Sequence, residues 1–272
     1  MLKQRVITAL CLAAVLFLIL WSRSEWLFGL FLLVFFAAGA WENARLFDNR
    51  YPIAVAVLAS LIFVFTGLWL SSTAYIWFAF VAVLIWIALL IPSLFRTIPP
   101  LHTLSGHIYQ ACYLFSILSS FLCVLLLYKR SALFLLSILV IAWLADIGAY
   151  FAGRAFGRHK LAPAISPGKT WEGVVGGMVT VILLAIASMN FSTPESNISV
   201  LIFEKYGWGG MIGGLVLLVA MSIVGDLLES KLKRRIGFED SSNLLPGHGG
   251  VLDRIDSLIP MLPLAVLLGM WL

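Results

Sequence analysis

Residues 51–95 decide the fold, and they read YPIAVAVLASLIFVFTGLWLSSTAYIWFAFVAVLIWIALLIPSLF. The stretch contains no Lys, Arg, Asp or Glu. It is far too long for one buried helix of a soluble protein, whereas a membrane crossing needs about 20 apolar residues. Transmembrane β-strands would alternate apolar and polar residues in short segments, and this stretch does not. It therefore predicts two membrane-spanning helices, separated at residues 71–73.

The rest of the chain has the same character. Of its 272 residues, 62% are hydrophobic and 11% are charged, whereas a soluble domain carries about a quarter charged residues. We expect an all-α, polytopic membrane bundle, because backbone polar groups must be hydrogen-bonded within the lipid-embedded helices. The sequence predicts about nine spans, at residues 6–22, 26–41, 52–70, 74–92, 108–128, 132–152, 174–190, 208–228 and 251–272.

The distribution of Lys and Arg predicts the orientation. If the N-terminus lies in the cytoplasm, all 18 basic residues except Arg23, Lys129, Arg130 and Lys205 fall on the cytoplasmic side, as the positive-inside rule favours. Basic residues needed for substrate binding would give the same bias at whichever face holds the site. The apolar run after Arg5 lacks the small residues of a signal-peptide cleavage site, so we expect an uncleaved first helix.

The two halves of the chain differ in polarity. The predicted helices of residues 1–135 carry almost nothing polar, so we expect them to form a scaffold. Residues 136–272 carry most of the acidic groups and two long polar loops, which we predict to be cytoplasmic. Catalytic groups are therefore expected in the C-terminal half.

Six acidic residues lie inside or at the mouth of a predicted span. An unpaired charge there costs about 2.5–3.5 kcal/mol or more, so each needs a physical reason. One ordinary reason is helix capping, since Asp253 falls in the first turn of the last predicted span, where a carboxylate offsets the helix dipole. The six residues are Asp146, Glu172, Asp226, Glu229, Asp253 and Asp256.

The positions of these carboxylates converge on one layer. The eighth and ninth predicted spans form an antiparallel pair, which places Asp226 and Asp253 at the same membrane depth, with Asp256 one turn deeper. Carboxylates at one depth on neighbouring helices form a site for a hard divalent cation such as Mg²⁺. Asp146 ends the sixth span and Glu172 opens the seventh, so both reach the same layer.

Basic residues surround this acidic layer. They precede the seventh span and follow the eighth, at Arg154, Arg158, Lys160, Lys169, Lys231, Lys233, Arg234 and Arg235. Metal-binding carboxylates among Lys and Arg are typical of polyphosphate chemistry, in which cations neutralise the phosphate oxygens. The alternative is a juxtamembrane basic patch that only contacts anionic lipid.

A glycine-rich segment, PGHGG at residues 246–250, leads into the last predicted helix. Exposed backbone N–H groups at such a helix N-terminus favour an anion. His248 is a candidate phosphate contact or a residue that orders the loop. It is not needed as a base, because a phosphate monoester is largely deprotonated near pH 7.

Two other patterns fail as nucleotide-binding motifs. Residues 168–170 read GKT, but the first glycine of a P-loop would fall at Pro163 and no strand precedes it. The glycines at positions 209, 210, 213 and 214 lie inside a predicted span. We interpret them as small residues that allow close helix packing.

Taken together, two segments resemble the hallmark sequences of phosphatidate cytidylyltransferases, the CDP-diacylglycerol synthases. The longer one contains SKLKR at residues 230–234, Asp240 and PGHGGVLDRID at residues 246–256. The other contains Asp146, residues 149–151, 153–154, 156–157 and 160–161, and ISPGKTWEG at residues 165–173. The resemblance covers about residues 140–260. It departs at Glu239, where the family usually has Lys, and this puts one phosphate contact in doubt, although Arg235 or Lys231 could replace it.

The resemblance implies that CTP and phosphatidate react to give CDP-diacylglycerol and pyrophosphate. In the expected in-line displacement, Asp226 and Asp253 hold Mg²⁺ on the triphosphate, Asp256 is a further ligand or partner, and Lys169 neutralises phosphate. Asp146 and Glu172 would bind metal or orient basic side chains, and a second cation nearby stays open. The expected substrate-binding residues are Arg154, Lys160, Ser166, Thr170, Lys233, Arg234, His248, Gly249 and Arg254.

The resemblance also implies a location and partners. We expect a multi-pass protein of the bacterial inner membrane that takes cytosolic CTP and inner-leaflet phosphatidate at its cytoplasmic face. A homodimer is compatible with the sequence, and no nucleic-acid partner is expected. The alternatives are a related CTP-dependent enzyme on another lipid, such as a CDP-archaeol synthase or a polyprenol kinase, and an ion-coupled transporter. A transporter predicts ionisable groups at several depths, which this sequence does not show.

Overall fold

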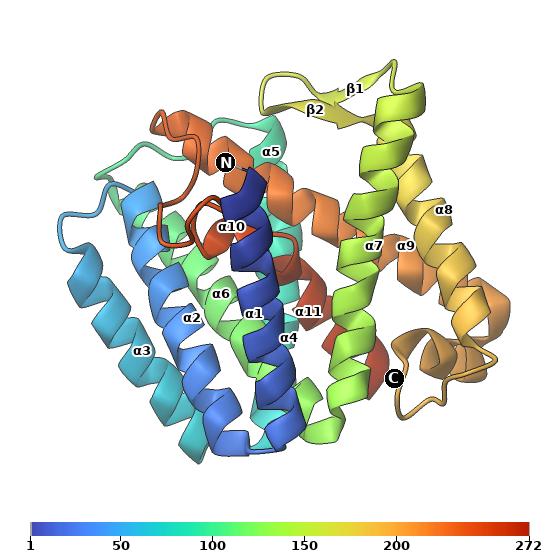
Figure 1. Cartoon of the computed structure of the whole chain (residues 1–272). Helices are drawn as coiled ribbons and strands as arrows, with labels where there is room; N and C mark the ends of the chain where they lie inside the picture. The colour runs from blue at the N-terminus through green and yellow to red at the C-terminus, as the bar shows by residue number, and fades with distance from the viewer. Residues whose placement is uncertain (1, 272) are drawn as a thin grey trace.

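Helices make up most of the chain in a computed structural model that describes residues 2–271 (Figure 1). Two short strands, β1 and β2, form an antiparallel hairpin between α7 and α8. The bounds are α1 (Leu2–Ser22), α2 (Glu25–Leu46), α3 (Pro52–Trp69), α4 (Ser72–Ile85), the π-helix η1 (Trp86–Leu90), α5 (Pro92–Phe95), α6 (Leu104–Arg130), α7 (Ala132–Phe156), β1 (Lys160–Ala162), β2 (Ser166–Thr170), α8 (Trp171–Ser188), α9 (Ile198–Arg235), α10 (Leu252–Ile255), α11 (Leu258–Val266) and the π-helix η2 (Leu267–Trp271).

The predicted fold class is confirmed. Among the described residues, seven helices are long and apolar enough to cross a membrane by length and composition. The predicted count of nine is not confirmed. The first predicted span coincides with α1, which is not among the seven, and the last one is interrupted after Ile255 and contains only a shorter apolar helix, Leu258–Gly269.

The starts of the long helices follow from short polar side chains. A Ser, Thr or Asn precedes six of them and accepts a hydrogen bond from a backbone N–H of the first turn, which would otherwise have no partner, whereas α3 follows Tyr51 without a side-chain cap and begins with Pro52. These capping residues are Ser24 for α2, Ser71 for α4, Thr103 for α6, Ser131 for α7, Thr170 for α8 and Asn197 for α9. Short polar residues between the apolar runs therefore determine where these helices begin.

Small residues let α7 and α8 pack closely. A Cβ atom at Gly177 would lie 2.7 Å from the carbonyl oxygen of Ala145, and one at Gly176 would overlap the side chain of Ala152. Within the described residues, the close packing predicted at residues 209–214 is not found at Gly209 and Gly213, where an added Cβ would meet nothing within 4 Å outside its own helix backbone. Small-residue packing therefore occurs one helix pair away from where the sequence suggested it.

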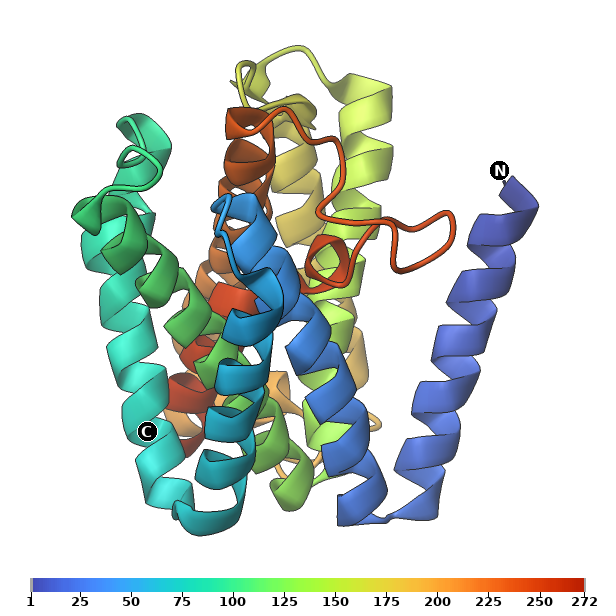
Figure 2. The ribbon, with the colours of Figure 1, turned by 90° about the vertical axis from the view of Figure 1, so that its left-hand side faces the viewer.

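Helix α1 stands apart from the rest of the bundle over most of its length (Figure 2). Behind it, stacked and edge-to-face aromatic rings hold α2, α3 and α6 together, among them Phe36, Phe63 and Phe121. The α1–α2 and α3–α4 junctions lie at one end of the bundle, and the hairpin, the C-terminal end of α9 and the loop of residues 236–251 lie at the other (Figures 1 and 2). Most of the predicted site residues belong to this second end.

Candidate active site

The strand β2 delivers Lys169 to the polar layer. Its Nζ lies 2.6 Å from Oδ2 of Asp226 on α9, and both side chains are about one quarter to one third exposed. Asp146 on α7 interacts electrostatically with both of them. Three elements that are far apart in the sequence therefore bring together two carboxylates and one ammonium group.

Lys233 on α9 makes the second charged cluster. Its Nζ lies 2.8 Å from Oε2 of Glu229, one turn earlier, and 2.5 Å from Oδ1 of Asp253 on α10. The side chains of Glu229 and Asp253 are 0% and 4% exposed. An ammonium shared by two buried carboxylates offsets part of the cost of burying them. α9 and the last segment of the chain thus meet through Lys233 and Asp253, whereas the sequence predicted that Asp226 and Asp253 lie side by side.

Asp256 connects the two clusters. It interacts electrostatically with Asp226 and with Glu229, and its Oδ1 accepts the backbone N–H of Ser257. The approach is close because α9 has a glycine at this level. A Cβ atom at Gly225 would overlap the carbonyl oxygen of Asp256. Gly225 is therefore required by backbone contact between α9 and the segment that carries the acidic residues.

Asp253 also orders the loop before it. Its Oδ2 accepts three hydrogen bonds of 2.8 Å, from the N–H groups of Ser241 and Gly250 and from the Ser241 hydroxyl. Burial raises the pKa of Asp253, but these bonds and Lys233 outweigh it and hold the pKa below its ordinary value. Asp253 lies in the first turn of α10 as predicted, but Val251 is the N-cap residue and no side chain caps this helix, so Asp253 orders the loop and belongs to the charged layer.

Glu42 is a residue of this site that the sequence analysis missed. It lies near the end of α2, is 0% exposed, and its Oε1 accepts hydrogen bonds from the Ser242 hydroxyl at 2.5 Å and the Val251 N–H at 2.9 Å. Its Oε2 accepts the Leu252 N–H at 2.6 Å. The sequence signal that could have identified Glu42 is a carboxylate directly after an apolar run. Glu42 falls one position beyond the predicted span of residues 26–41, so it is not among the acidic residues assigned to a span.

The glycine-rich segment curves around these carboxylates. Gly247 and Gly249 have φ angles of 76° and 80°, in the left-handed region that glycine tolerates. A Cβ at Gly250 would overlap the Glu42 carboxylate and the Ser241 hydroxyl. The loop bounds a polar cavity of about 200 Å³, lined by Asp240, Gly247, His248, Gly249 and Arg254.

Several predicted site residues lie outside the two clusters. Glu172 pairs with His159 at 2.7 Å and accepts its backbone N–H, so it fastens the hairpin instead of contacting the layer's cations. Thr170 caps α8 through the Gly173 N–H. Arg154 donates to the hydroxyl of Tyr150, one turn earlier. Lys160, Ser166 and Arg234 lie at the same end of the bundle on β1, β2 and α9.

Two other basic residues of α9 are engaged with the backbone. Lys231 donates to the carbonyl groups of Ser93, Leu94 and Arg96 at 2.6–3.1 Å, and so caps α5. Arg235 donates to the Pro99 carbonyl. Lys231 is therefore not free to replace the lysine that the family pattern has at position 239, where Glu239 is exposed, whereas Nη1 of Arg235 is buried without a hydrogen-bond partner.

The donor set suits a hard cation only in part. Among the described residues, no group of three or more His, Cys, Asp or Glu side chains is close enough together to hold a metal ion. Oε1 of Glu229 is nevertheless buried without a hydrogen-bond partner, and Asp226 and Asp256 offer further oxygens beside it. Both oxygens of Asp253 are already engaged, so that residue fits a cation only if Lys233 releases Oδ1.

Comparison with known proteins gives matches over nearly the whole chain. The model of a family described as "Cytidylyltransferase family" matches residues 3–271. A phosphatidate cytidylyltransferase of Haemophilus influenzae is 34% identical over 97% of the chain and 96% of its own length. One of Pseudomonas aeruginosa is 36% identical over 97% and 95%. One of Staphylococcus haemolyticus is 40% identical over 48% of the chain and 46% of its own length.

Proposed function

The chain belongs to the cytidylyltransferase family, and from this membership we infer that it transfers the cytidylyl group of CTP to phosphatidate in the membrane, giving CDP-diacylglycerol and pyrophosphate. The observation that carries this inference is that relatives named phosphatidate cytidylyltransferase match 97% of the chain at 34% and 36% identity. A layer of paired carboxylates and lysines at one end of an apolar bundle suits a reaction between a water-soluble triphosphate and a lipid phosphate. The archaeal lipid, polyprenol and transporter alternatives are not favoured.

The residues of the layer support an in-line displacement. A phosphate oxygen of phosphatidate attacks the α-phosphorus of CTP, the bond from that phosphorus to the bridging oxygen breaks, and pyrophosphate leaves. No protein base is needed, because the attacking monoester is largely deprotonated near pH 7. Lys169 and Lys233 are the proposed phosphate contacts, since each already places an ammonium group at the layer. Triphosphate oxygens would compete with Asp226 and Asp253 for these two cations.

We propose that Asp226 and Asp256 would hold the Mg²⁺, because no three acidic side chains of the described residues lie close enough together to share one ion. The ion would neutralise charge on the triphosphate and on the leaving pyrophosphate. Asp253 is proposed mainly to hold Lys233 and the loop of residues 236–251 in place, because it already accepts four hydrogen bonds. Asp146 would orient Lys169 from the other side.

The proposed location follows from the charge distribution. The hairpin and the end of α9 carry Lys160, Lys169, Lys233 and Arg234 at one end of the bundle (Figure 1). The positive-inside rule supports a cytoplasmic location for this end, with CTP arriving from the cytosol and phosphatidate from the inner leaflet. The bacterial relatives support the inner membrane as the site.

A homodimer is proposed through α9. Gly209 and Gly213 are spaced as a small-xxx-small pair, and an added Cβ at either position would meet no other part of the described chain within 4 Å beyond its own helix backbone. Such a pair on an outward face allows close approach of another helix. Cross-linking of the protein in membranes, compared with a Gly213→Leu variant, tests this interface.

The activity is tested with purified protein in detergent or liposomes. Radiolabelled CTP is supplied with Mg²⁺ and with phosphatidate, an ether-linked archaeal analogue or dolichol. We expect label in a CDP-lipid only, or at least ten times faster, with phosphatidate. Preferred labelling of either other lipid would assign the chain to a different substrate, and no labelled lipid with any of them would contradict nucleotidyl transfer.

A further inference from the structure

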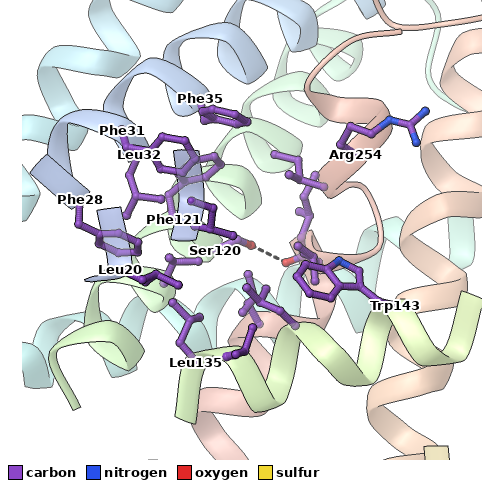
Figure 3. Close-up of a pocket in the computed structure, with 18 of the residues that line it drawn as sticks. Leu20, Phe28, Phe31, Leu32, Phe35, Ser120, Phe121, Leu135, Trp143 and Arg254 are labelled. Atoms are coloured by element: carbon purple, nitrogen blue, oxygen red, sulfur yellow. Dashed lines mark hydrogen bonds between the residues drawn. The ribbon is translucent and has the colours of Figure 1, made fainter. Parts of the chain in front are cut away.

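An apolar pocket of about 590 Å³ lies between α1 and the bundle. Figure 3 shows aromatic side chains of α2, among them Phe28 and Phe31, on one side and Trp143 of α7 on another. Phe121 of α6 and Leu135 of α7 line it as well. The volume is within the range of about 300–1,000 Å³ that is usual for ligand sites.

One end of this pocket is polar. His248 and Arg254 line the apolar pocket and also the neighbouring polar cavity of about 200 Å³. Nε of Arg254 donates to the His248 carbonyl at 3.0 Å, while no hydrogen bond of its Nη groups is found among the described side chains. Nδ1 of His248 is buried without a hydrogen-bond partner. The junction of the two spaces thus offers an accessible guanidinium and an unsatisfied imidazole nitrogen.

We propose that the apolar pocket holds an acyl chain of the lipid substrate, with the lipid phosphate at the junction, bound by Arg254 and His248. The inference rests on the proposed function and adds the place where the lipid binds. Charge complementarity identifies the occupant, because an apolar cavity that ends at a cation matches an amphiphile with an anionic head. CTP does not match, since it has no apolar part to fill the larger cavity.

Helix α1 forms one wall of the site and is tied to the loop that binds the head. Leu16, Phe17 and Leu20 line the pocket from α1. The hydroxyl of Thr8, also on α1, donates to the Pro246 carbonyl at 2.8 Å. Residues of α1 and of α2, α6 and α7 form facing walls of the pocket, so we place the entry of the lipid chain between α1 and these helices. A bound chain would therefore contact α1 and the core helices together.

A substitution that fills the pocket tests the assignment. Leu139 is half-buried and lines the pocket, whereas Leu133 on the same helix is 62% exposed and does not. We expect Leu139→Trp to raise the KM for dioleoyl phosphatidate about tenfold, to raise the KM for dioctanoyl phosphatidate much less, and to leave the KM for CTP unchanged. Leu133→Trp is the matched control and should change none of the three. Equal effects of Leu139→Trp on both lipids, or no effect, would overturn the proposal.

Photolabelling gives a readout that does not need turnover. The full-length protein is irradiated with phosphatidate that carries a diazirine on one acyl chain, and in parallel with phosphatidylcholine that carries the same chain. We expect adducts on α1, α2 and α7 residues of the pocket, several times more with phosphatidate, and loss of this preference in Arg254→Gln. Equal labelling by both lipids would show an annular lipid without head-group recognition, and labelling elsewhere would place the chain outside the pocket. Either result refutes the proposal.

The two hypotheses fail in different ways. If the unmodified protein forms no CDP-diacylglycerol while phosphatidate still labels the pocket selectively, the proposed function fails and the lipid site stands. If the product forms and the adducts lie elsewhere, the function stands and the lipid site is wrong. The label position and the product are therefore measured on the same sample.

Discussion

The carboxylates of the polar layer differ in what holds them, and this difference predicts how each tolerates loss of charge. Asp226 is one third exposed and pairs with Lys169. We expect Asp226→Asn to lower kcat at least about a hundredfold, as removal of one electrostatic group typically does, with little change in thermal stability. Asp253→Asn should lower kcat as strongly and also the melting temperature, because Lys233 then faces an amide.

The control for these variants is Asp48→Asn. Asp48 is 70% exposed and pairs with His102, so the same chemical change there should leave both quantities unaltered. The measurements are turnover over a Mg²⁺ titration and thermal unfolding of the purified protein. Near-normal turnover of Asp226→Asn at any Mg²⁺ concentration would remove Asp226 from the proposed metal site.

Glu42 predicts a long-range effect on the active-site loop. In Glu42→Gln an amide NH₂ replaces one of two oxygens that accept three buried hydrogen bonds. A buried donor that faces another donor costs about 1–3 kcal/mol, so we expect lower thermal stability and a reduced kcat. Glu25→Gln, at the exposed start of the same helix, is the matched control. A variant with unchanged melting temperature and kcat would show that Glu42 does not position the loop.

Position 239 tests the departure from the family pattern. Glu239 is exposed two residues before Ser241, whose N–H binds Asp253. Introducing a cation there with Glu239→Lys should lower the KM for CTP more than it changes kcat, because the added charge attracts the triphosphate. Glu204→Lys makes the same charge change in the N-terminal part of α9 and should leave the KM unchanged. If the wild type and both variants have the same KM for CTP and the same kcat, the residue at position 239 does not contribute to CTP binding or turnover.

The charged layer could be inferred from the sequence because Asp226, Asp253 and Lys169 are conspicuous in an apolar chain. Their pairing could not, because hydropathy gives the depth of a residue but not its partner. The sequence places Glu229 inside or at the mouth of a predicted span, but it does not reveal that Lys233 joins Glu229 to Asp253. The partners of Glu42 are two backbone N–H groups and the Ser242 hydroxyl, 200 or more residues away in the chain, and no residue pattern reveals such a pairing.

At the scale of elements, the apolar runs predicted most of the long helices. The prediction failed for the last span, and its proline residues explain why. The last predicted span contains Pro260 and Pro263, and its described part consists of α10, α11 and a π-helical end. A proline inside a helix removes a hydrogen bond and breaks or bends the rod. A run of apolar residues therefore overestimated the length of this helix.

The close contact between α7 and α8 predicts that adding one methyl group at this interface lowers the stability of the protein. Gly177→Ala would place a Cβ 2.7 Å from the Ala145 carbonyl oxygen, so we expect a loss of about 1–3 kcal/mol in stability, as overpacking usually causes. Gly29→Ala in α2 meets no atom within 4 Å and should be neutral or slightly stabilising. The measurement is thermal unfolding of both variants. Equal melting temperatures of Gly177→Ala and Gly29→Ala would contradict close packing of α7 against α8.

For the whole molecule, the charge distribution predicts which end faces the cytoplasm. Lys160 lies on the hairpin and Lys205 near the start of α9. Lys160→Cys and Lys205→Cys are each introduced into a variant in which Cys11 and Cys112 are replaced by Ser. In intact cells, we expect a membrane-impermeant thiol reagent to label position 205 and to spare position 160. Inverted membrane vesicles should give the opposite result. Labelling of both from one side would refute the predicted topology.

The division into a scaffold half and a catalytic half stays a prediction, but the two halves share one functional unit. Glu42 reaches across sequence separations of 200 to 210 residues to bind the loop of residues 236–251. Arg45, from the same helix, donates to the Ser241 carbonyl. Removing residues 1–135 would therefore remove groups that shape the active-site loop.

This reach has a consequence for biosynthesis. The ribosome delivers Glu42 to the membrane long before its partners near Val251 have been translated. Until then its carboxylate has to stay hydrated near the lipid headgroups or take up a proton, since an unpaired charge in hydrocarbon costs several kcal/mol. The second helix can thus reach its final depth only after translation is nearly complete, so that in a truncated nascent chain neither this helix nor the loop of residues 236–251 would have its final position.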